Sequence, residues 1–492
     1  MSVTDWETVI GLEVHCELAT ETKMFCGCPN DFGASPNTNV CPVCLGLPGS
    51  LPVLNERAVE FALRVGEALH CAVPEASIFH RKNYFYPDMP KNYQVSQYDE
   101  PICGNGWLMV GERRIGIERA HLEEDAGKTS HVGAASGGRV HGADHSLVDY
   151  NRAGVPLLEI VSKPDLRSPE EARSYVAELR GVLEAIGVSD VKMEEGSLRV
   201  DANISLRRNG TTKLGTRTEI KNMNSLRSLG RALEYEAARQ ADVLESGDAV
   251  MQETRHWDEE AGRTHSLRSK EESHDYRYFP EPDLVPVQPS AEWRDRVRAA
   301  MPELPAARRA RLIDAWGISE TDAGVLVSTP GLADYAEAAV AAGATDTGRD
   351  VVNWVTGDLM ARLKETGAAP SGLPLAPAGL AELVKLVADG TLSRPLAKEV
   401  LAAALAGEGD GSPAAIVSAR GLAQVSDEGA LAAAVQAVLD AHPAEVDRYR
   451  TGEDKDRKKL RGFFMGKVMA EMKGRGNPQV LNRMLDEALR TN

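Results

Sequence analysis

Carboxylates and an imidazole recur at every second position in a stretch near the N-terminus. Residues 9–18 read V-I-G-L-E-V-H-C-E-L, so a strand here sends Glu13, His15 and Glu17 to one face and the apolar side chains to the other. One face then belongs to the core, and the other carries two carboxylates and a histidine. Such a face can bind a divalent cation, with a polar, solvated sheet face as the alternative.

Two further stretches carry the same kinds of side chain. The alternation in residues 117–125 places His121 and Glu123 on one side, and Glu159 stands alone in the apolar run 155–161. An ionised carboxylate in apolar surroundings needs a partner or a metal. Three such strands can surround one Mg²⁺ ion, or equally a Mn²⁺ ion, since histidine is a less usual ligand for Mg²⁺. The ligands that we predict are Glu13, His15, Glu123 and Glu159.

A second charged face appears later in the chain. In residues 198–207 the even-numbered positions are apolar and the odd-numbered ones are polar, and residues 216–222 continue with alternating charges. A mixture of cations and carboxylates suits a nucleotide–metal site, with an exposed strand face as the alternative. The positions of interest are Arg199, Asp201, Asn203, Glu219 and Lys221.

Four of the seven cysteines form a C-x-C pair and a C-x-x-C pair on either side of residues 29–40. Two thiolate pairs joined by a short loop can close a tetrahedral Zn(Cys)₄ site, and four protein ligands leave no open position for catalysis. We therefore predict a structural zinc ion, with four reduced thiols or a redox pair as alternatives. The ligands are Cys26, Cys28, Cys41 and Cys44.

Familiar nucleotide-binding motifs are incomplete. Residues 126–129 end in the G-K-T of a P-loop, but Leu122 stands where its first glycine belongs. The G-N-G at 104–106 lacks the third glycine of a dinucleotide fingerprint, because Met109 occupies that position. The sequence also lacks the G-x-S-x-G elbow of a serine hydrolase.

Residues 81–94, R-K-N-Y-F-Y-P-D-M-P-K-N-Y-Q, concentrate tyrosines in a chain with only 5% aromatic residues. Cations interleaved with tyrosines suit a loop that contacts bases or phosphates. Packing of these rings in the core is the alternative.

The elements that position these residues belong to a chain of 492 residues with a formal net charge of −17, long enough for about three or four domains. The acidic balance argues against a protein that coats nucleic acid, because such binding neutralises phosphates with Lys and Arg. No apolar run reaches the ~18 residues of a membrane span, and no targeting signal is evident, so we expect a cytoplasmic protein.

The organisation of the chain changes along its length. Strand-like and helix-like stretches alternate up to about residue 290, Ala/Leu-rich helical sequence follows, and the Gly-rich segment 407–413 is typical of a linker. The clearest helix signal is the capping box that starts at Ser168 and reaches Glu171, with Gly187 as the stop.

Several segments in order along the chain are specific when taken together. They are G-L-E-V-H at 11–15, K-N-Y-F-Y-P-D-M-P-K-N-Y-Q at 82–94, H-L-E-E-D-A-G-K at 121–128, T-R-T-E-I-K-N-M-N-S at 216–225, D-Y-R-Y-F-P-E-P-D-L at 275–284, F-F-M-G-K-V-M at 463–469 and G-R-G-N-P at 474–478. These segments resemble the B subunits of the aspartyl/glutamyl-tRNA amidotransferases.

The resemblance implies an ATP-dependent transamidation of mischarged tRNA. In this family, the side-chain carboxylate of Glu-tRNA(Gln) or Asp-tRNA(Asn) is activated with ATP on the B subunit. Ammonia that the amidase, the A subunit, frees from glutamine then arrives through an internal channel and displaces the phosphate. The C subunit, which is small, braces the other two. The family's motifs map the Mg²⁺ site to the four ligands predicted above, and the charged positions of the second face to nucleotide or substrate contacts.

The resemblance also implies an α+β fold. Residues 1–292 form a cradle with an antiparallel sheet related to glutamine synthetase and with the zinc insert at 26–44. Residues 293–406 form an all-α domain, and residues 407–492 form a linker and a YqeY-like helical tail.

The tail concentrates positive charge. Between Lys455 and Arg475 there are eight basic and two acidic residues, which suits capture of the tRNA backbone, with a solvated helical face as the alternative. The tRNA contacts that we predict are Lys458, Lys459, Arg461, Lys467, Lys473 and Arg475.

Two other functions stay open at this point. One is a non-catalytic subunit that delivers tRNA to its partner, and the other is a stand-alone ATP-dependent carboxylate–amine ligase for a small molecule. Glu159 in its apolar strand favours an enzyme over the first, and the basic tail favours tRNA over a small substrate.

Overall fold

The computed structural model describes residues 5–133, 143–269, 276–343, 348–423, 427–472 and 475–490. The chain forms two compact units, Met1–Pro305 and Ala306–Asn492. Among the described residues, the first unit combines a large sheet with helices and the second is helical. The prediction of a mixed α+β fold is thus confirmed.

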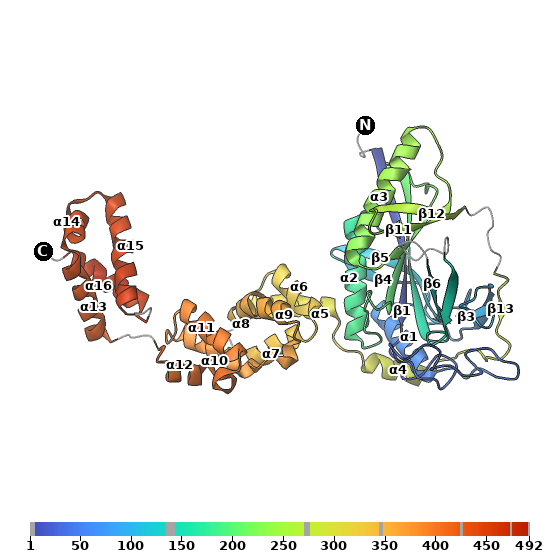
Figure 1. Ribbon diagram of the computed structural model, residues 1–492, viewed down its shortest axis with the longest axis horizontal. Helices are drawn as coiled ribbons and strands as arrows, with labels where there is room; N and C mark the ends of the chain where they lie inside the picture. The colour runs from blue at the N-terminus through green and yellow to red at the C-terminus, as the bar shows by residue number, and fades with distance from the viewer. Residues whose placement is uncertain are drawn as a thin grey trace. The chain divides into compact units, whose positions relative to one another are not determined.

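One large sheet organises the first unit (Figure 1). Its strands lie in the order β12-β11-β10-β9-β1-β8-β5-β3-β2-β13, and β4 is paired with β5. Paired neighbours are antiparallel except β10 and β11, which are parallel. A second sheet contains β6 and β7. The strands are β1 (Trp6–Glu17), β2 (Phe79–Asn83), β3 (Tyr93–Gln97), β4 (Gly106–Val110), β5 (Arg113–Glu124), β6 (Lys128–Val132), β7 (His145–Asp149), β8 (Pro156–Ser162), β9 (Leu198–Arg208), β10 (Thr218–Met223), β11 (Glu253–Asp258), β12 (Arg263–Ser269) and β13 (Phe279–Pro280).

Alternation along the central strands decides which face of the sheet joins the core. On β1, Leu12 and Val14 are buried in the same core as Val200, Ala202 and Ile204 of β9, whereas Glu13 and His15 lie on the opposite face. The burial pattern therefore agrees with the faces expected from the sequence.

Three helices cover the apolar face and share its core. At the start of the second of them, the Ser168 hydroxyl accepts a hydrogen bond from the Glu171 amide at 3.1 Å, as the capping box predicts. Gly187 follows its end with a φ of +66°. The polar face is thus left for chemistry. The helices are α1 (Glu56–Ala68), α2 (Pro169–Ala185) and α3 (Leu226–Glu245).

Helix α4 (Ala291–Ala299) belongs with the sheet. It packs on α1, and Val297 joins the core of the first unit. The compact unit that contains the sheet thus runs from Met1 to Pro305 and includes this helix.

The second unit contains two hydrophobic clusters, one built from residues between Leu312 and Val417 and one from residues between Leu431 and Leu489. Among the described residues, no helix is long and apolar enough to cross a membrane. The helices are α5 (Pro305–Trp316), α6 (Glu320–Ser328), α7 (Leu332–Ala342), α8 (Gly348–Trp354), a π-helical turn (Val355–Leu359), α9 (Met360–Thr366), α10 (Pro377–Ala388), α11 (Arg394–Leu405), α12 (Pro413–Arg420), α13 (Glu428–Ala441), α14 (Pro443–Thr451), α15 (Asp454–Glu471) and α16 (Pro478–Arg490), with short 3₁₀ turns at Pro370–Gly372 and Glu408–Gly411.

The segment 407–413, for which the sequence suggests a linker, forms turns and a short 3₁₀ helix. Gly407 and Gly411 adopt φ values of +86° and +75°, and Ser412 caps α12, whose Ile416 is buried in the first of the two clusters. The glycines supply left-handed turns inside a packed connection.

Candidate active site

The polar face of the sheet holds a first group of metal-ligand side chains, which we call the histidine cluster: His15, Glu123 and Glu159. One ligand atom from each of the three lies within 4.8 Å of the others. The register of the sheet brings them together, because His15 on β1 is paired with Glu159 on β8. The distance from His15 Nε2 to Glu159 Oε2 is 3.5 Å.

His121 supports this cluster from β5, where it is paired with the other side of Glu159. Its Nε2 lies 3.4 Å from Glu159 Oε2 and 3.6 Å from Glu123 Oε2. Arg119 Nε donates to His121 Nδ1 at 3.4 Å, which leaves Nε2 to carry the proton that faces the carboxylates. His121 was absent from the predicted ligands, although the alternation of β5 already placed it beside Glu123.

The electrostatics of the cluster favour ionised carboxylates. Burial opposes ionisation of Glu159, yet its pKa is lowered well below the usual range by the adjacent His121 and His15. Burial likewise opposes the charge on His15, but its pKa is raised by a hydrogen bond to Glu159 and by the charges of Glu159 and Glu123. Ionised carboxylates beside imidazoles form a donor set that fits a divalent cation.

A second group, the carboxylate cluster, contains Glu13, Asp201 and Glu219, whose ligand atoms also lie within 4.8 Å of one another. Asn203 Nδ2 donates to Glu13 Oε1 at 2.9 Å. Lys221 Nζ donates to Asp201 Oδ2 at 2.5 Å and lies 3.1 Å from Glu219 Oε1. Burial and the charges of Glu159 and Glu219 raise the pKa of Glu13, so a cation here would relieve the repulsion.

The four predicted Mg²⁺ ligands thus fall into two groups instead of one. Glu13 and His15 share a face of β1, but side chains two residues apart on a strand start about 7 Å from each other. The pairing of Glu13 with Asp201 across β1 and β9 assigns Glu13 to the carboxylate cluster.

Arg199 lies in a different network from the other predicted nucleotide contacts. Its Nη2 donates to Asp125 Oδ2 at 2.7 Å, and its Nη1 donates to Glu17 Oε1 at 3.3 Å. This ion-pair network adjoins the histidine cluster, since Arg199 is paired with His15 across β1 and β9.

A cavity of about 440 Å³ opens beside the carboxylate cluster. Its lining includes Glu13 and Asn203 together with backbone-rich segments near Gly11 and Gly215. Arg217 and Gln252 add a cation and an amide to its wall. The cavity therefore combines room for a small ligand with polar groups that can orient it.

The four cysteines of the zinc insert come together. Their sulfur atoms lie within 4.8 Å of one another, and the Cys41 amide donates to Cys44 Sγ at 3.1 Å. A tetrahedral thiolate site fits this donor set.

A buried lysine, Lys23, lies beside the insert, and no pattern in the sequence points to it. Lys23 is fully buried and donates to the carbonyl oxygens of Asn39 and Ala153 at 2.7 and 2.8 Å. This lysine ties the insert to the loop before β8.

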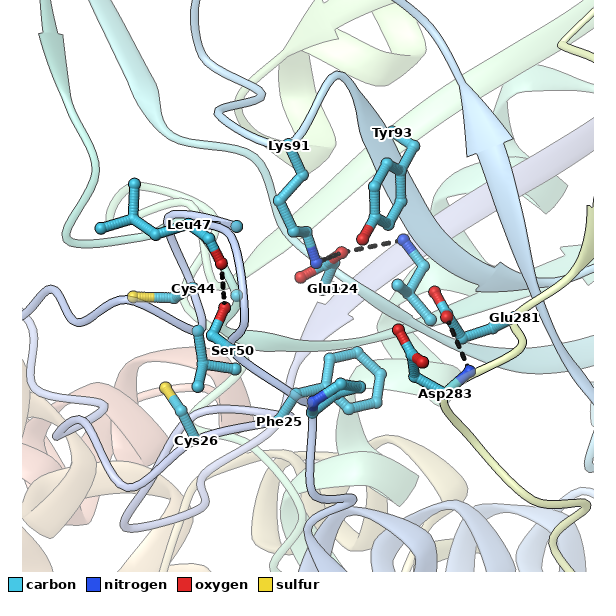
Figure 2. Close-up of a pocket in the computed structure, with 15 residues that line it drawn as sticks. Phe25, Cys26, Cys44, Leu47, Ser50, Lys91, Tyr93, Glu124, Glu281 and Asp283 are labelled. Atoms are coloured by element: carbon cyan, nitrogen blue, oxygen red, sulfur yellow. Dashed lines mark hydrogen bonds and ion pairs between the residues drawn. The ribbon is translucent and has the colours of Figure 1, made fainter.

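A small cavity of about 70 Å³ lies beside this insert. Figure 2 shows the residues that line it. Cys26 and Cys44 lie on one side of it, and Lys91 forms an ion pair with Glu124 across its middle. Both members of this pair are buried, so breaking it would leave an uncompensated buried charge beside the cysteine insert.

The predicted tRNA contacts of the tail, on α15 and just after it, differ in their surroundings. Lys458, Lys459 and Lys467 are exposed. Arg461, however, forms a bidentate ion pair with Asp486 of α16, with distances of 2.6 and 2.8 Å. Arg475 Nη1 donates to the carbonyl of Gly421 at 3.0 Å, and Lys473 lies outside the described residues.

Comparison with known proteins identifies the family. A model of the GatB/GatE catalytic domain matches residues 8–295, and a model of the GatB domain matches residues 334–489. The chain belongs to the family of aspartyl/glutamyl-tRNA(Asn/Gln) amidotransferase B subunits. Within this family, it is 54% identical to the protein of that name from Frankia casuarinae over 98% of this chain and 96% of the relative.

Two further B subunits of the family are similar over almost their whole length. Identity is 50% to that of Caldanaerobacter subterraneus, over 98% of this chain and 99% of the relative, and 52% to that of Anaeromyxobacter sp., over 99% and 100%. Membership of this family confirms the resemblance seen in the sequence and the prediction of an amidotransferase subunit.

Proposed function

We propose that the chain is the carboxylate-activating subunit of a tRNA-dependent amidotransferase. Its substrates are Glu-tRNA(Gln), Asp-tRNA(Asn) or both, together with ATP. A side-chain carboxylate oxygen attacks the γ-phosphorus of ATP and releases ADP. Ammonia then attacks the carbonyl carbon of the acyl phosphate, phosphate leaves, and a proton is lost to give the amide.

The observation that carries this proposal is the adjacency of the two clusters on one sheet face. The clusters meet on β1, because Glu13 and His15 lie two residues apart on this strand and His15 is paired with Glu159 on β8. Burial raises the pKa of Glu13, and the charge of Glu159 raises it further. A divalent cation held by the residues of either cluster would supply positive charge that stabilises the transferring phosphoryl group. The donor sets of both clusters fit Mg²⁺ or Mn²⁺.

The chain's own residues hold this arrangement in place. His121 orients Glu159, Asn203 holds Glu13, and Lys221 spaces the carboxylates of Asp201 and Glu219. We place ATP in the 440 Å³ cavity next to the carboxylate cluster, where the nearby Arg217 can pair with a phosphate. The buried surroundings of the histidine cluster can keep water from the acyl phosphate.

Further parts of the proposal rest on family membership. The sheet unit is a cradle related to glutamine synthetase, and the YqeY-like tail grips tRNA. Zinc in the Cys26–Cys44 insert is structural. The chain works in the cytoplasm in a heterotrimer with an amidase (the A subunit), which delivers ammonia through a channel, and with a small C subunit.

The test uses the purified complex with Glu-tRNA(Gln), ATP, Mg²⁺ and ammonium chloride in place of glutamine. Formation of Gln-tRNA and ADP in equal amounts is the expected result. If Glu123→Ala or Glu159→Ala makes Gln-tRNA at the wild-type rate, the assigned cluster is wrong. Omission of tRNA should abolish amide formation, because the substrate is the charged tRNA.

A further inference from the structure

Five tyrosine rings form a continuous row at the β13 end of the sheet, which we call the tyrosine row: Tyr84, Tyr86, Tyr98, Tyr276 and Tyr278. Tyr98 and Tyr278 are stacked, with centroids 4.4 Å apart and an interplanar angle of 14°. The other neighbours meet at centroid distances of 5.8 to 6.3 Å. Five of the chain's 11 tyrosines thus gather at one place.

The tyrosine row continues the face that carries the histidine cluster. Ser96 on β3 is paired with Glu123, and its hydroxyl donates to Glu123 Oε2 at 3.0 Å. Tyr98 follows two positions later, directly after the last residue of β3, and alternation places it on the same side as Ser96. The row therefore begins two residues after Ser96, which contacts the predicted metal ligand Glu123.

Lys82 links the row to the cluster. Its ammonium lies 5.2 Å from the centroid of the Tyr276 ring. Burial opposes its charge, yet the pKa of Lys82 is raised by the charges of Glu123, Tyr278 and Glu159. A cation thus stands between the tyrosines and the carboxylates, where it can pair with a phosphate or with a substrate carboxylate.

Exposure argues against a role in the core. Tyr98 is 55% exposed and Tyr276 is 36% exposed, and Phe85, between two tyrosines of the row in the sequence, is 78% exposed. Rings that pack to stabilise a fold are normally buried. Tyr98 is thus an exposed ring stacked on the half-buried Tyr278. An exposed aromatic face with a nearby cation is the feature that proteins use to stack unpaired bases.

The position of the row favours the terminal adenosine of tRNA over the adenine of ATP as its ligand. The charged amino acid is esterified to the ribose of the last nucleotide of the tRNA, an unpaired adenosine, so that base must lie within one nucleotide's reach of the reacting carboxylate. ATP carries an adenine as well, but the 440 Å³ cavity beside Glu13 is lined from β1, β8 and β9, on the other side of the histidine cluster in the sheet. The open row at the sheet edge suits the end of a polymer.

We propose that the tyrosine row, through Tyr98 and Tyr278, stacks the 3′-terminal adenosine of the charged tRNA and so places the aminoacyl carboxylate at the histidine cluster. This inference rests on the proposed function and adds the part of the substrate that the sheet edge recognises. These tyrosines act as positioning residues, because they hold the nucleotide that carries the reacting group.

The first test measures steady-state kinetics of the whole complex with ammonium chloride as nitrogen donor. Tyr98→Ala and Tyr278→Ala should raise the KM for Glu-tRNA(Gln) about 5- to 100-fold and leave the KM for ATP unchanged. Tyr98→Phe and Tyr278→Phe keep the stacking face and should behave like wild type. Leu267→Ala, at a 53% exposed position on β12 at the other edge of the sheet, is the matched control and should change neither constant.

A second test asks whether the effect of removing the terminal base depends on the Tyr98 ring. Binding of uncharged tRNA is compared with binding of the same tRNA lacking its terminal adenosine, in wild type and in the Tyr98→Leu variant, which retains apolar volume without an aromatic face. Loss of the adenosine should weaken binding to wild type and change binding to the variant much less.

Equal losses in both proteins, an unchanged KM for tRNA in the alanine variants, or a raised KM for ATP would each overturn the inference. Loss of complex assembly in the alanine variants, with wild-type kinetics in the phenylalanine variants, would assign the row to the docking of a partner protein and overturn it too. The proposed function fails separately, if the wild-type complex makes neither Gln-tRNA from Glu-tRNA(Gln) nor Asn-tRNA from Asp-tRNA(Asn).

Discussion

His15 on β1 and Glu159 on β8 are directly paired across antiparallel strands, and their side chains approach to 3.5 Å between Nε2 and Oε2. His121 approaches the same carboxylate oxygen from β5 at 3.4 Å. Glu159 therefore lies between two imidazoles in the middle of the sheet. This arrangement makes Glu159 the residue on which the histidine cluster depends most.

Replacement of Glu159 should abolish most of the activity without unfolding the chain. Glu159→Gln keeps the shape but removes the charge, and we expect kcat for Gln-tRNA formation to fall about 100-fold or more. His121→Asn removes only the orienting contact and should cost about 10- to 100-fold. Rates are measured at saturating ATP with ammonium chloride, and equal rates for His121→Asn and wild type would contradict the orienting role.

The two clusters should bind metal independently. Mn²⁺ bound to the complex can be counted by paramagnetic resonance in the presence of ADP, and Glu159→Gln and Glu13→Gln should each remove about one ion. The double variant should lose both. If one single variant removes all bound Mn²⁺, the chain has one metal site and the grouping of Glu13 with Asp201 and Glu219 has no functional meaning.

Zinc content tests the cysteine insert. Protein purified without chelators should contain about one zinc ion per chain, and Cys41→Ser or Cys28→Ser should bring this close to zero. Cys16→Ser, at a buried cysteine of β1 outside the insert, is the control and should retain the metal. A zinc content near zero in the wild-type protein would contradict the zinc assignment.

The basic residues of α15 should separate into two kinds. Lys458→Glu with Lys459→Glu should weaken tRNA binding and reduce its salt dependence by about one unit of slope for each phosphate that is no longer neutralised. Arg461→Glu should in addition loosen the tail, because it breaks the pair with Asp486, and amide hydrogen exchange in α16 should increase.

A charge-matched control separates a tRNA site from a general effect of charge. Lys364→Glu with Lys385→Glu makes the same charge change on α9 and α10 and should leave tRNA binding nearly unchanged. If this double variant and the α15 double variant bind tRNA equally well, the basic residues of α15 form only a solvated helical face.

Glu17 should make stability depend on pH. Burial and the charge of Asp125 raise its pKa from 4.5 to about 8. Between these values the folded protein retains a proton that the unfolded chain releases, so this contribution to stability is present below pH 4.5 and is lost as the pH rises through about 8. Glu17→Gln cannot ionise, and its melting temperature relative to wild type should therefore rise from about pH 5 to about pH 8. A difference that is the same at both pH values would contradict the raised pKa.

The sequence by itself determined the local properties of the site. The period-two alternation of β1 and β9 placed Glu13, His15, Asp201 and Asn203 on a polar face, and the cysteine spacing predicted which four sulfurs would meet. The capping box at Ser168 fixed the start of α2. Such features depend on bond geometry and hydrogen bonds among near neighbours in the chain, which sequence spacing describes well.

Tertiary structure alone decided how these residues are grouped. The register of β1 with β8 and β9 sent His15 to Glu159 and Glu13 to Asp201, and the packing of α15 on α16 paired Arg461 with Asp486. The row of tyrosines joins residues near 84 and 98 with residues near 278 in the same way. Pairing register and helix packing are set by contacts between segments far apart in the chain, and no local period encodes them.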